Sequence, residues 1–244
     1  MNFPDEVMDR PLDALVGATD SVIVDLPDWH QVTTPSFASG GLNGVARCRL
    51  PETALDQRID QVLSNYRGIR WRWTVGASDT PGLSERLRRR GLAERSVIGL
   101  WRASDLSVPD GAQAVEATSA DDVTAFSAVM AEGWSAPLAP LLAYNARLAV
   151  TPAKQRLFLA RVNGEPAGSA GLAIVERSVS LIGAVVLPRF RGRGVYRALL
   201  NARFSLARSL GKAIVTCQAN PQTSGPILQS LGFQSVGTFP VFGP

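Results

Sequence analysis

The sequence has no acidic residue after Glu176, although eight lysines and arginines follow it before the chain ends at Pro244. The whole chain has a formal charge of +4, so the part up to Glu176 is net negative. Such a charge asymmetry indicates an anionic ligand on the C-terminal part. Nucleic acid is an alternative ligand for this basic tail. However, the sequence shows no helix-turn-helix pattern, zinc spacing or interleaved aromatic and basic residues, and we predict no nucleic-acid partner.

Cysteine and histidine are also scarce. The two cysteines, Cys48 and Cys217, lie in apolar strand-like segments and form neither a disulfide framework nor a metal-binding spacing. The single histidine, His30, gives little support to a histidine-based metal site or a Cys–His dyad. We expect His30 in a loop or at the surface, and we predict no metal site.

Long apolar runs are absent as well. No segment is long enough to span a bilayer, and the acidic, polar N-terminus differs from a signal peptide. A hydrophobic content of 45% with 19% charged residues is ordinary for a soluble globular protein. We predict a cytoplasmic protein without a membrane partner, built as one large domain or two small ones.

Turn-forming residues cluster from Ala103 to Gly111, between two strand-like segments. We place a boundary there and predict domains 1–106 and 107–244. In the second domain, hydrophobic periodicity and capping residues predict a series of strands and helices. The predicted strands are 114–117, 156–162, 167–175, 178–187, 213–218 and 234–242, and the predicted helices are 121–132, 137–150, 195–210 and 224–231.

One segment of this domain has the features of an anion-binding turn. A strand ending in Val185-Val186-Leu187 meets Pro188, and a turn rich in arginine follows before a helix begins at Val195. The start of a helix exposes N–H groups without an intrahelical acceptor, and the helix dipole adds positive potential there. Gly192 and Gly194 let an anion approach these groups closely. The segment predicts a pyrophosphate-binding cradle, and the alternative is an arginine-rich surface turn with helix-capping glycines.

The cradle resembles the acyl-CoA-binding motif of the GCN5-related N-acetyltransferases (GNAT). That motif is Arg/Gln-x-x-Gly-x-Gly/Ala after a strand that ends in Val-x-Pro. Two registers fit the sequence: Arg189-x-x-Gly192-x-Gly194 matches the letters, whereas Arg191-x-x-Gly194-x-Tyr196 matches the family's distance from the proline. We prefer the second register because the strand fixes where the cradle lies. It places Tyr196 in a position that is normally small.

The resemblance covers about residues 112–244 and implies that acetyl-CoA or another acyl-CoA is the co-substrate. Its pantetheine would bind along the strand as an added strand does. The N–H of Val186 or a neighbour would polarise the thioester carbonyl. The implied acyl-CoA-binding residues are Val185, Val186, Leu187, Arg191, Gly192, Arg193, Gly194, Val195, Tyr196, Arg197 and Asn220. For Asn220 an Asn-Pro turn is the equal alternative.

Proton transfer requires a general base and a general acid. Many relatives place a general-acid tyrosine where this sequence has Leu228, so that role is absent or has moved. We name Glu176, Tyr196 and Cys217 as candidates for the catalytic groups. For Cys217 the alternative is a small buried hydrophobe, and for Glu176 it is a solvated surface acid.

Glu132 and Trp134, at and just after the end of the predicted helix 121–132, each have two alternative interpretations. Glu132 is a candidate base, and a surface acid is the alternative. Trp134 shares helical spacing with Phe126 and Met130. We expect Trp134 in the core, and an acceptor cage is the alternative.

The first half weakly repeats the second. Thr74–Leu92 and Thr216–Phe233 share the order strand, loop, helix, Gly-apolar. The turn Pro51–Leu55 has no glycine and carries Glu52 where phosphate would bind. We therefore expect an α/β (α+β) protein with two acetyltransferase-like domains, each a mixed, mostly antiparallel central sheet flanked by helices. The first is a degenerate copy without the cradle, and an unrelated α/β domain is the alternative.

These observations predict an acyl-CoA-dependent N-acyltransferase, specifically an N-acetyltransferase that acts on a primary amine of a small molecule. A non-catalytic acyl-CoA-binding or sensor protein is the alternative, since no obvious base is visible. We expect a monomer, whose two halves form a pseudo-dimer, or a homodimer.

Overall fold

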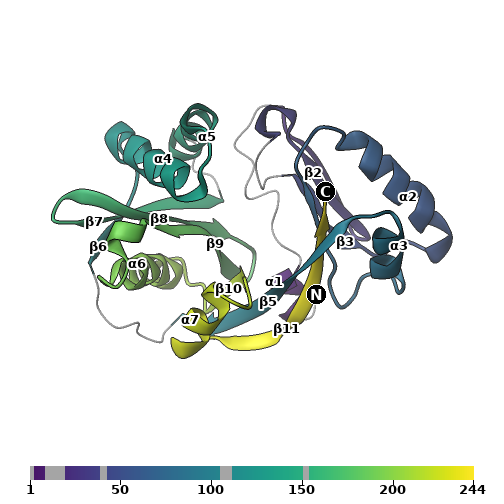
Figure 1. Cartoon of the computed structure of the whole chain (residues 1–244). Coiled ribbons are helices and arrows are strands. Elements are labelled where there is room, and N and C mark those ends of the chain that lie inside the picture. Colours follow the sequence, from purple (N-terminus) through teal and green to yellow (C-terminus); the bar gives the residue numbers. More distant parts are fainter. Residues whose placement is uncertain (1–2, 9–19, 39–42, 105–111, 151–153) are drawn as a thin grey trace. The chain divides into compact units, whose positions relative to one another are not determined.

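A computed structural model of the chain describes residues 3–8, 20–38, 43–104, 112–150 and 154–244 (Figure 1). Its elements divide into two units. Unit 1 comprises Met1–Leu100 with Gln218–Pro244, and unit 2 comprises Trp101–Cys217. The predicted boundary between residues 106 and 107 lies outside the described residues and stays a prediction. The C-terminal residues 218–244, which we assigned to the second domain, belong to unit 1.

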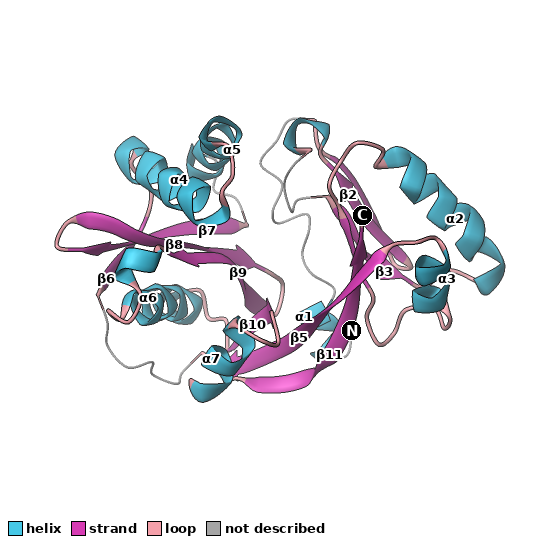
Figure 2. Ribbon diagram, in the orientation of Figure 1, coloured by secondary structure: helices cyan, strands magenta, loops and turns pink. Residues whose placement is uncertain are grey.

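Unit 2 holds a sheet with the strand order β10-β9-β8-β7-β6. The strand β9 pairs in parallel with β10 and antiparallel with β8, and the remaining pairs are antiparallel. The strands are β6 (Gln113–Glu116), β7 (Gln155–Val162), β8 (Glu165–Ile174), β9 (Ser178–Val186) and the first part of β10 (Ile214–Ala219). The helices are α4 (Ala120–Trp134), α5 (Leu138–Val150) and α6 (Val195–Ser209). Figure 2 shows α4 and α5 on one face of this sheet and α6 on the other.

Several of these elements begin or end at the residues that the sequence predicted. The Ser119 hydroxyl caps α4 by accepting the Asp122 N–H at 3.1 Å. The hairpin between β7 and β8 turns at Asn163 and Gly164, which both have positive φ. Gly211 follows α6 with a φ of 67°. The predicted mixed, mostly antiparallel α/β fold is confirmed.

Small residues of β8 let the helices approach the sheet closely. A Cβ on Gly168 would lie 2.7 Å from Cγ1 of Val195, the first residue of α6. The start of α6 therefore rests directly on β8, and this contact fixes the position of the turn that precedes the helix.

Unit 1 has the strand order β1-β2-β3-β4-β11-β5. Its strands are β1 (Val22–Leu26), β2 (Trp29–Thr33), β3 (Gly44–Cys48), β4 (Arg72–Thr74), β5 (Ala93–Ala103, which ends in unit 2) and β11 (Gln234–Gly243). Its helices are α1 (Phe3–Met8), α2 (Glu52–Asn65), α3 (Leu83–Arg89) and α7 (Ser224–Ser230). The sequence predicts strands at 45–50, 71–75 and 96–101 and helices at 52–66 and within 83–92, which form β3, β4, β5, α2 and α3. It gives no such signal for α1, β1 and β2.

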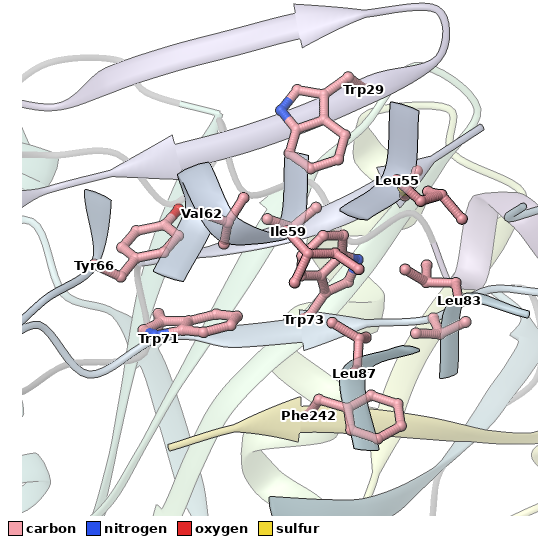
Figure 3. Close-up of a cluster of buried hydrophobic side chains, with 13 residues drawn as sticks. Trp29, Leu55, Ile59, Val62, Tyr66, Trp71, Trp73, Leu83, Leu87 and Phe242 are labelled. Atoms are coloured by element: carbon pink, nitrogen blue, oxygen red, sulfur yellow. The ribbon is translucent and has the colours of Figure 1, made fainter. Parts of the chain in front are cut away.

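The core of unit 1 is rich in aromatic side chains (Figure 3). Trp29 and Trp73 meet edge to face with ring centroids 5.4 Å apart, and Tyr66 stacks on Trp71 at 5.1 Å. The Tyr66 hydroxyl donates to the Val32 carbonyl at 2.7 Å, which satisfies the one polar group that this ring buries.

His30 is the main correction in unit 1. It lies on β2 with only 4% of its surface exposed, and its Nδ1 is 3.0 Å from Oδ1 of Asp25 on the neighbouring strand. We expected His30 in a loop or at the surface, but pairing of β2 between β1 and β3 buries the ring.

The basic run at the end of α3 is neutralised by acids rather than left free. Arg86 and Arg90 bind carboxylates of α2, while Arg88 binds Glu94 and Arg89 binds Glu85. None of the helices in the described ranges is long and apolar enough to cross a bilayer.

Candidate functional site

Strands β9 and β10 pair over only part of their length. Their parallel ladder begins with Ser178 and Ile214 and ends with the pair Leu181 and Cys217. On its other edge, β9 continues to pair with β8 up to Val186. The two strands therefore separate after Leu181, at a point that we call the fork. Beyond the fork β9 has an edge that no described strand pairs with.

The open edge presents the backbone of Val186. The neighbouring Leu187 N–H donates to the Ala167 carbonyl on β8 at 3.0 Å. Alternate residues of an antiparallel strand direct their N–H and C=O groups to opposite edges. Val185 and Leu187 thus bond toward β8, whereas Val186 directs its N–H and carbonyl to the open edge. This is the residue that we predicted to polarise a thioester.

A β-bulge lies between the fork and Val186. Ile182 pairs with Gly171 and Val185 pairs with Ser169, so two residues of β9 oppose one of β8. Gly183, the first residue of the bulge, has a φ of 54°. A bulge bends its strand and interrupts the ladder, so it helps to free the edge. Gly183 was the only signal for this feature in the sequence.

The turn before α6 leaves a row of backbone donors without acceptors. Pro188–Phe190 forms a 3-10 turn, and Gly192 and Gly194 have φ values of 75° and 76°. The N–H of Ala198 is the first in α6 with an intrahelical acceptor, the Gly194 carbonyl at 3.0 Å. Within the described part of the chain, the N–H groups of residues 192–197 have no hydrogen-bond partner. Six donors at a helix start are a suitable cradle for a polyphosphate.

The arginines of the turn divide into two kinds. Arg189 forms ion pairs with Glu132 and with Glu165, the latter at 3.4 Å. The other three have no acidic partner among the described residues: Arg191, Arg193 and Arg197. Since Arg189 is occupied, the geometry favours the register of the motif that starts at Arg191.

Three polar side chains beside the fork influence one another's protonation: Tyr196, Arg203 and Cys217. Tyr196 lies in the first turn of α6, and Arg203 lies two turns later on the same side of the helix. Burial raises the pKa of Tyr196 to about 12, and the Arg203 charge opposes this rise. Burial lowers the pKa of Arg203, against the opposite effect of Tyr196 and Cys217.

Arg203 is an unusual member of this cluster because it is only 1% exposed and has no carboxylate partner in the described ranges. Its Nε donates to the Leu199 carbonyl at 2.9 Å, and its Nη1 donates to the Gly171 carbonyl at 3.2 Å. Its Nη2 is buried without a hydrogen-bond partner among the described atoms. A guanidinium has no acceptor, so toward Tyr196 it can only donate. The Tyr196 hydroxyl therefore keeps its own proton for a different acceptor.

Sequence reasoning did not identify Arg203. The available signal was its spacing, since an arginine seven residues after Tyr196 falls on the apolar side of the helix together with Leu199.

Glu176 does not join this cluster. It is exposed in the turn between β8 and β9, and its backbone carbonyl accepts a hydrogen bond from Nζ of Lys212 at 2.6 Å. The bulge at Gly183 is seven residues further along, about 20 Å at the rise of a strand. The expectation that Glu176 faces the acceptor is not supported by this position.

Two other sequence candidates have structural roles in unit 1. The Asn220 side-chain oxygen accepts the N–H groups of Gln222 and Thr223, at 2.8 and 3.2 Å. It thus forms the turn that was its alternative interpretation. Leu228 is fully buried in α7 and offers no proton.

The residues at the end of α4 also differ in their surroundings. Phe126 and Met130 are buried, as expected, and Glu132 pairs with Arg189. Trp134 is 46% exposed, so the prediction that it lies in the core is wrong. The helix ends directly after it, at Ser135 with a φ of 50°, and this ending holds the indole at the surface.

Comparison with known proteins gives the site its context. Residues 120–233 match the acetyltransferase (GNAT) family, and this range contains the fork, the cradle and the Tyr196 cluster. The match agrees with the resemblance noted in the cradle and supports a transferase. No curated protein matches the chain at a significant level.

Solved structures extend the likeness in fold to both units. A GCN5-related N-acetyltransferase from Kribbella flavida is 18% identical with a TM-score of 0.71, covering 100% of this chain and 96% of its own. One from Sphaerobacter thermophilus is 15% identical with a TM-score of 0.59, covering 91% and 82%. A tandem GNAT protein from the clavulanic acid biosynthesis pathway is 12% identical with a TM-score of 0.58, covering 97% and 87%. At these identities the likeness shows a common fold.

Proposed function

We propose that this protein is an acyl-CoA-dependent N-acetyltransferase that transfers an acetyl group to a primary amine of a small molecule. One observation carries the proposal. The carboxyl end of β9 combines an open strand edge at Val186 with six unpartnered N–H donors and three unpaired arginines in the turn that follows. Acetyl-CoA has groups that complement both parts, because its pantetheine carries amides and its nucleotide carries a pyrophosphate and a 3′-phosphate.

The cradle would hold the pyrophosphate through the N–H groups of residues 192–197, with Arg191, Arg193 and Arg197 adding charge. The Val186 N–H would donate to the thioester carbonyl and stabilise the oxyanion that forms there. Removal of one such donor typically costs about 3 kcal/mol of transition-state stabilisation.

Tyr196 would act as the general acid, with Arg203 as its positioning residue. The amine nitrogen forms a bond to the thioester carbon, the C–S bond breaks, and the departing sulfur takes the proton of the Tyr196 hydroxyl. The Arg203 guanidinium stabilises the phenolate that this leaves. The proton of the new ammonium group passes to solvent water, and Tyr196 recovers its proton from the same source. Cys217, the third member of this cluster, is a buried thiol.

We also infer that unit 1 contains a degenerate copy of the same fold. Its helix α2 begins after Pro51 rather than after glycine, and Glu52 in its first turn lies 3.8 Å from Arg86. An acid at the helix start repels phosphate, so we expect one acetyl-CoA per chain.

The proposal is tested by thiol release. We expect the protein with acetyl-CoA and a panel of primary amines to release CoA thiol at a rate that saturates with acetyl-CoA. The alternative, a non-catalytic acyl-CoA-binding protein, is favoured by Leu228 in the place of the usual tyrosine. It predicts saturable acetyl-CoA binding without thiol release for every amine, including hydroxylamine.

A further inference from the structure

Trp134 is one of the few large apolar side chains that unit 2 leaves exposed. It is 46% exposed, and Leu138, four residues later at the start of α5, is 41% exposed. The two residues flank the turn between α4 and α5. Among the described residues their side chains have no polar partner, and neither belongs to the buried core.

The Trp134 indole packs against Gly183, the first residue of the bulge in β9. A Cβ on Gly183 would lie 3.2 Å from Cη2 and 3.6 Å from Cζ2 of Trp134. The end of α4 is held there by a second close approach, since a Cβ on Gly133 would lie 2.1 Å from Cγ1 of Val185. Both glycines are therefore needed for this placement, which puts the ring within van der Waals contact of the strand that carries Val186.

The position of Trp134 relative to the sheet decides what it can touch. Helices α4 and α5 cover one face of the unit 2 sheet, and α6, with the cradle and Tyr196, covers the other (Figure 2). A thioester held at the Val186 edge would lie between these faces, at the opening that the fork leaves. A nucleophile that approaches from the face opposite α6 would pass Trp134.

The charges near Trp134 restrict the kind of amine that it can bind. The sequence from Gly133 to Val150 contains no Asp or Glu, and Glu132 is paired with Arg189. A polyamine or another polycation would find no free carboxylate on this segment. An exposed indole and an exposed leucine on the two sides of one turn instead suit an apolar or aromatic body, and the indole face also attracts the single ammonium group of such an amine.

We propose that Trp134 and Leu138 bind the body of the acceptor, and that the acceptor is a monoamine with an aromatic or alkyl body rather than a polyamine or an amino sugar. This inference rests on the proposed function, because it places the acceptor beside the thioester that the cradle would hold. Trp134 is then a specificity-determining residue, and its effect falls on the acceptor and not on acetyl-CoA.

The test compares three acceptors at saturating acetyl-CoA: phenethylamine, ethylamine and spermidine, with thiol release as the readout. We expect kcat/KM for phenethylamine to exceed that for each of the others by about 10-fold or more, the usual contribution of a filled apolar subsite. Trp134→Ala should lower kcat/KM for phenethylamine by about 10-fold, through a higher KM for this amine. It should change kcat/KM for ethylamine little and leave the KM of acetyl-CoA unchanged. Trp134→Phe should restore most of the loss.

The matched control is Leu210→Ala. Leu210 is 40% exposed at the far end of α6, so its removal takes away a similar apolar surface without touching the bulge. We expect wild-type selectivity from this variant.

Two failures are distinguishable. Hydroxylamine, a small nucleophile with no body to bind, reports on acyl transfer alone. If hydroxylamine and every amine give no thiol release, both the proposed function and the acceptor subsite are overturned. The acceptor proposal alone is overturned by either of two results when hydroxylamine is acetylated. One is an equal kcat/KM for spermidine and phenethylamine, and the other is a Trp134→Ala variant with the wild-type ratio of kcat/KM for phenethylamine to that for ethylamine.

Discussion

Leu181 of β9 and Cys217 of β10 form the last pair of the parallel ladder between these strands, and the strands separate beyond it. By strand alternation the Val186 N–H faces the edge where no described strand pairs, whereas the Val185 N–H bonds toward β8. The two adjacent valines thus have opposite roles. One belongs to the sheet, and the other faces the open edge.

This contrast gives the first prediction. Val186→Pro removes an N–H that the fold does not use, so we expect a melting temperature near that of the wild type but weak acetyl-CoA binding and a large loss of thiol release. Val185→Pro removes a ladder hydrogen bond and leaves a carbonyl of β8 unsatisfied, so it should destabilise the fold by about 1–3 kcal/mol. Thermal melts and titrations of both variants check this. Equal affinity for acetyl-CoA in Val186→Pro and wild type would show that the edge does not bind pantetheine.

The arginines of the cradle give the second prediction. Replacing Arg193 and Arg197 together by Gln should weaken acetyl-CoA binding by about 10-fold or more, because two charge-assisted contacts to phosphate are lost. Arg189→Gln is the control, because it also removes a positive charge from the same turn. It should leave the affinity for acetyl-CoA unchanged because Arg189 forms ion pairs with Glu132 and Glu165. If instead Arg189→Gln weakens binding and the double variant does not, the motif lies in the other register.

The third prediction concerns the proton donor. Tyr196→Phe should lower the rate of thiol release with hydroxylamine by about 100-fold, the usual range for a general acid, while the Kd of acetyl-CoA stays within a factor of two or so. Burial raises the pKa of Tyr196 to about 12, so its acid form persists well above its ordinary pKa of 10. We therefore expect no Tyr196-dependent fall in rate between pH 8 and about pH 11.

A double variant of Tyr196 and Arg203 tests whether the two residues act together. If Arg203 acts through Tyr196, the loss caused by Tyr196→Phe should largely disappear in an Arg203→Met background, as expected for two groups that act as a unit. Fully additive losses would mean that Arg203 only supports the packing around the Gly171 carbonyl.

The fourth prediction concerns stability at alkaline pH in unit 1. Burial, with the Asp79 charge next, raises the pKa of Cys48 from 9.0 to about 12, and burial raises the pKa of Tyr66 from 10.0 to about 12. The unfolded chain releases these protons at the lower pKa values while the folded chain retains them, so stability falls as pH rises. Each group contributes a slope of about −1.4 kcal/mol per pH unit, from about pH 9 for Cys48 and pH 10 for Tyr66.

Urea denaturation at pH 8, 9, 10 and 11 measures these slopes. Cys48→Ala should be less sensitive to pH than the wild type from pH 9 to 11, and Tyr66→Phe only from pH 10 to 11. Parallel curves for wild type and Cys48→Ala would contradict the account of a buried, protonated thiol.

The sequence predicted what depends on neighbours along the chain. Ser119 caps α4, Asn163-Gly164 turns the hairpin and Gly194 opens the cradle because each needs only the few residues around it. The contrast between Arg189 and its neighbours was beyond this reasoning, since Glu132 and Glu165 reach Arg189 only after α4 and β8 have packed.

The features that were missed depend on packing between distant segments. The fork depends on the register of Cys217 against Leu181, and the partner of Arg203 is a carbonyl on β8. His30 was expected at the surface, yet pairing on both edges of β2 buries it. Trp134 follows helical spacing as a core residue does, but the helix ends there and leaves it half exposed.

The most direct test of the central claim is a calorimetric titration of the full chain with acetyl-CoA. We predict saturable binding at micromolar to millimolar ligand with about one site per chain, and its loss in Gly194→Glu, which places an acid and a side chain in the phosphate cradle. A wild-type protein that binds no acetyl-CoA over this range, or a Gly194→Glu variant with wild-type affinity, would contradict the account.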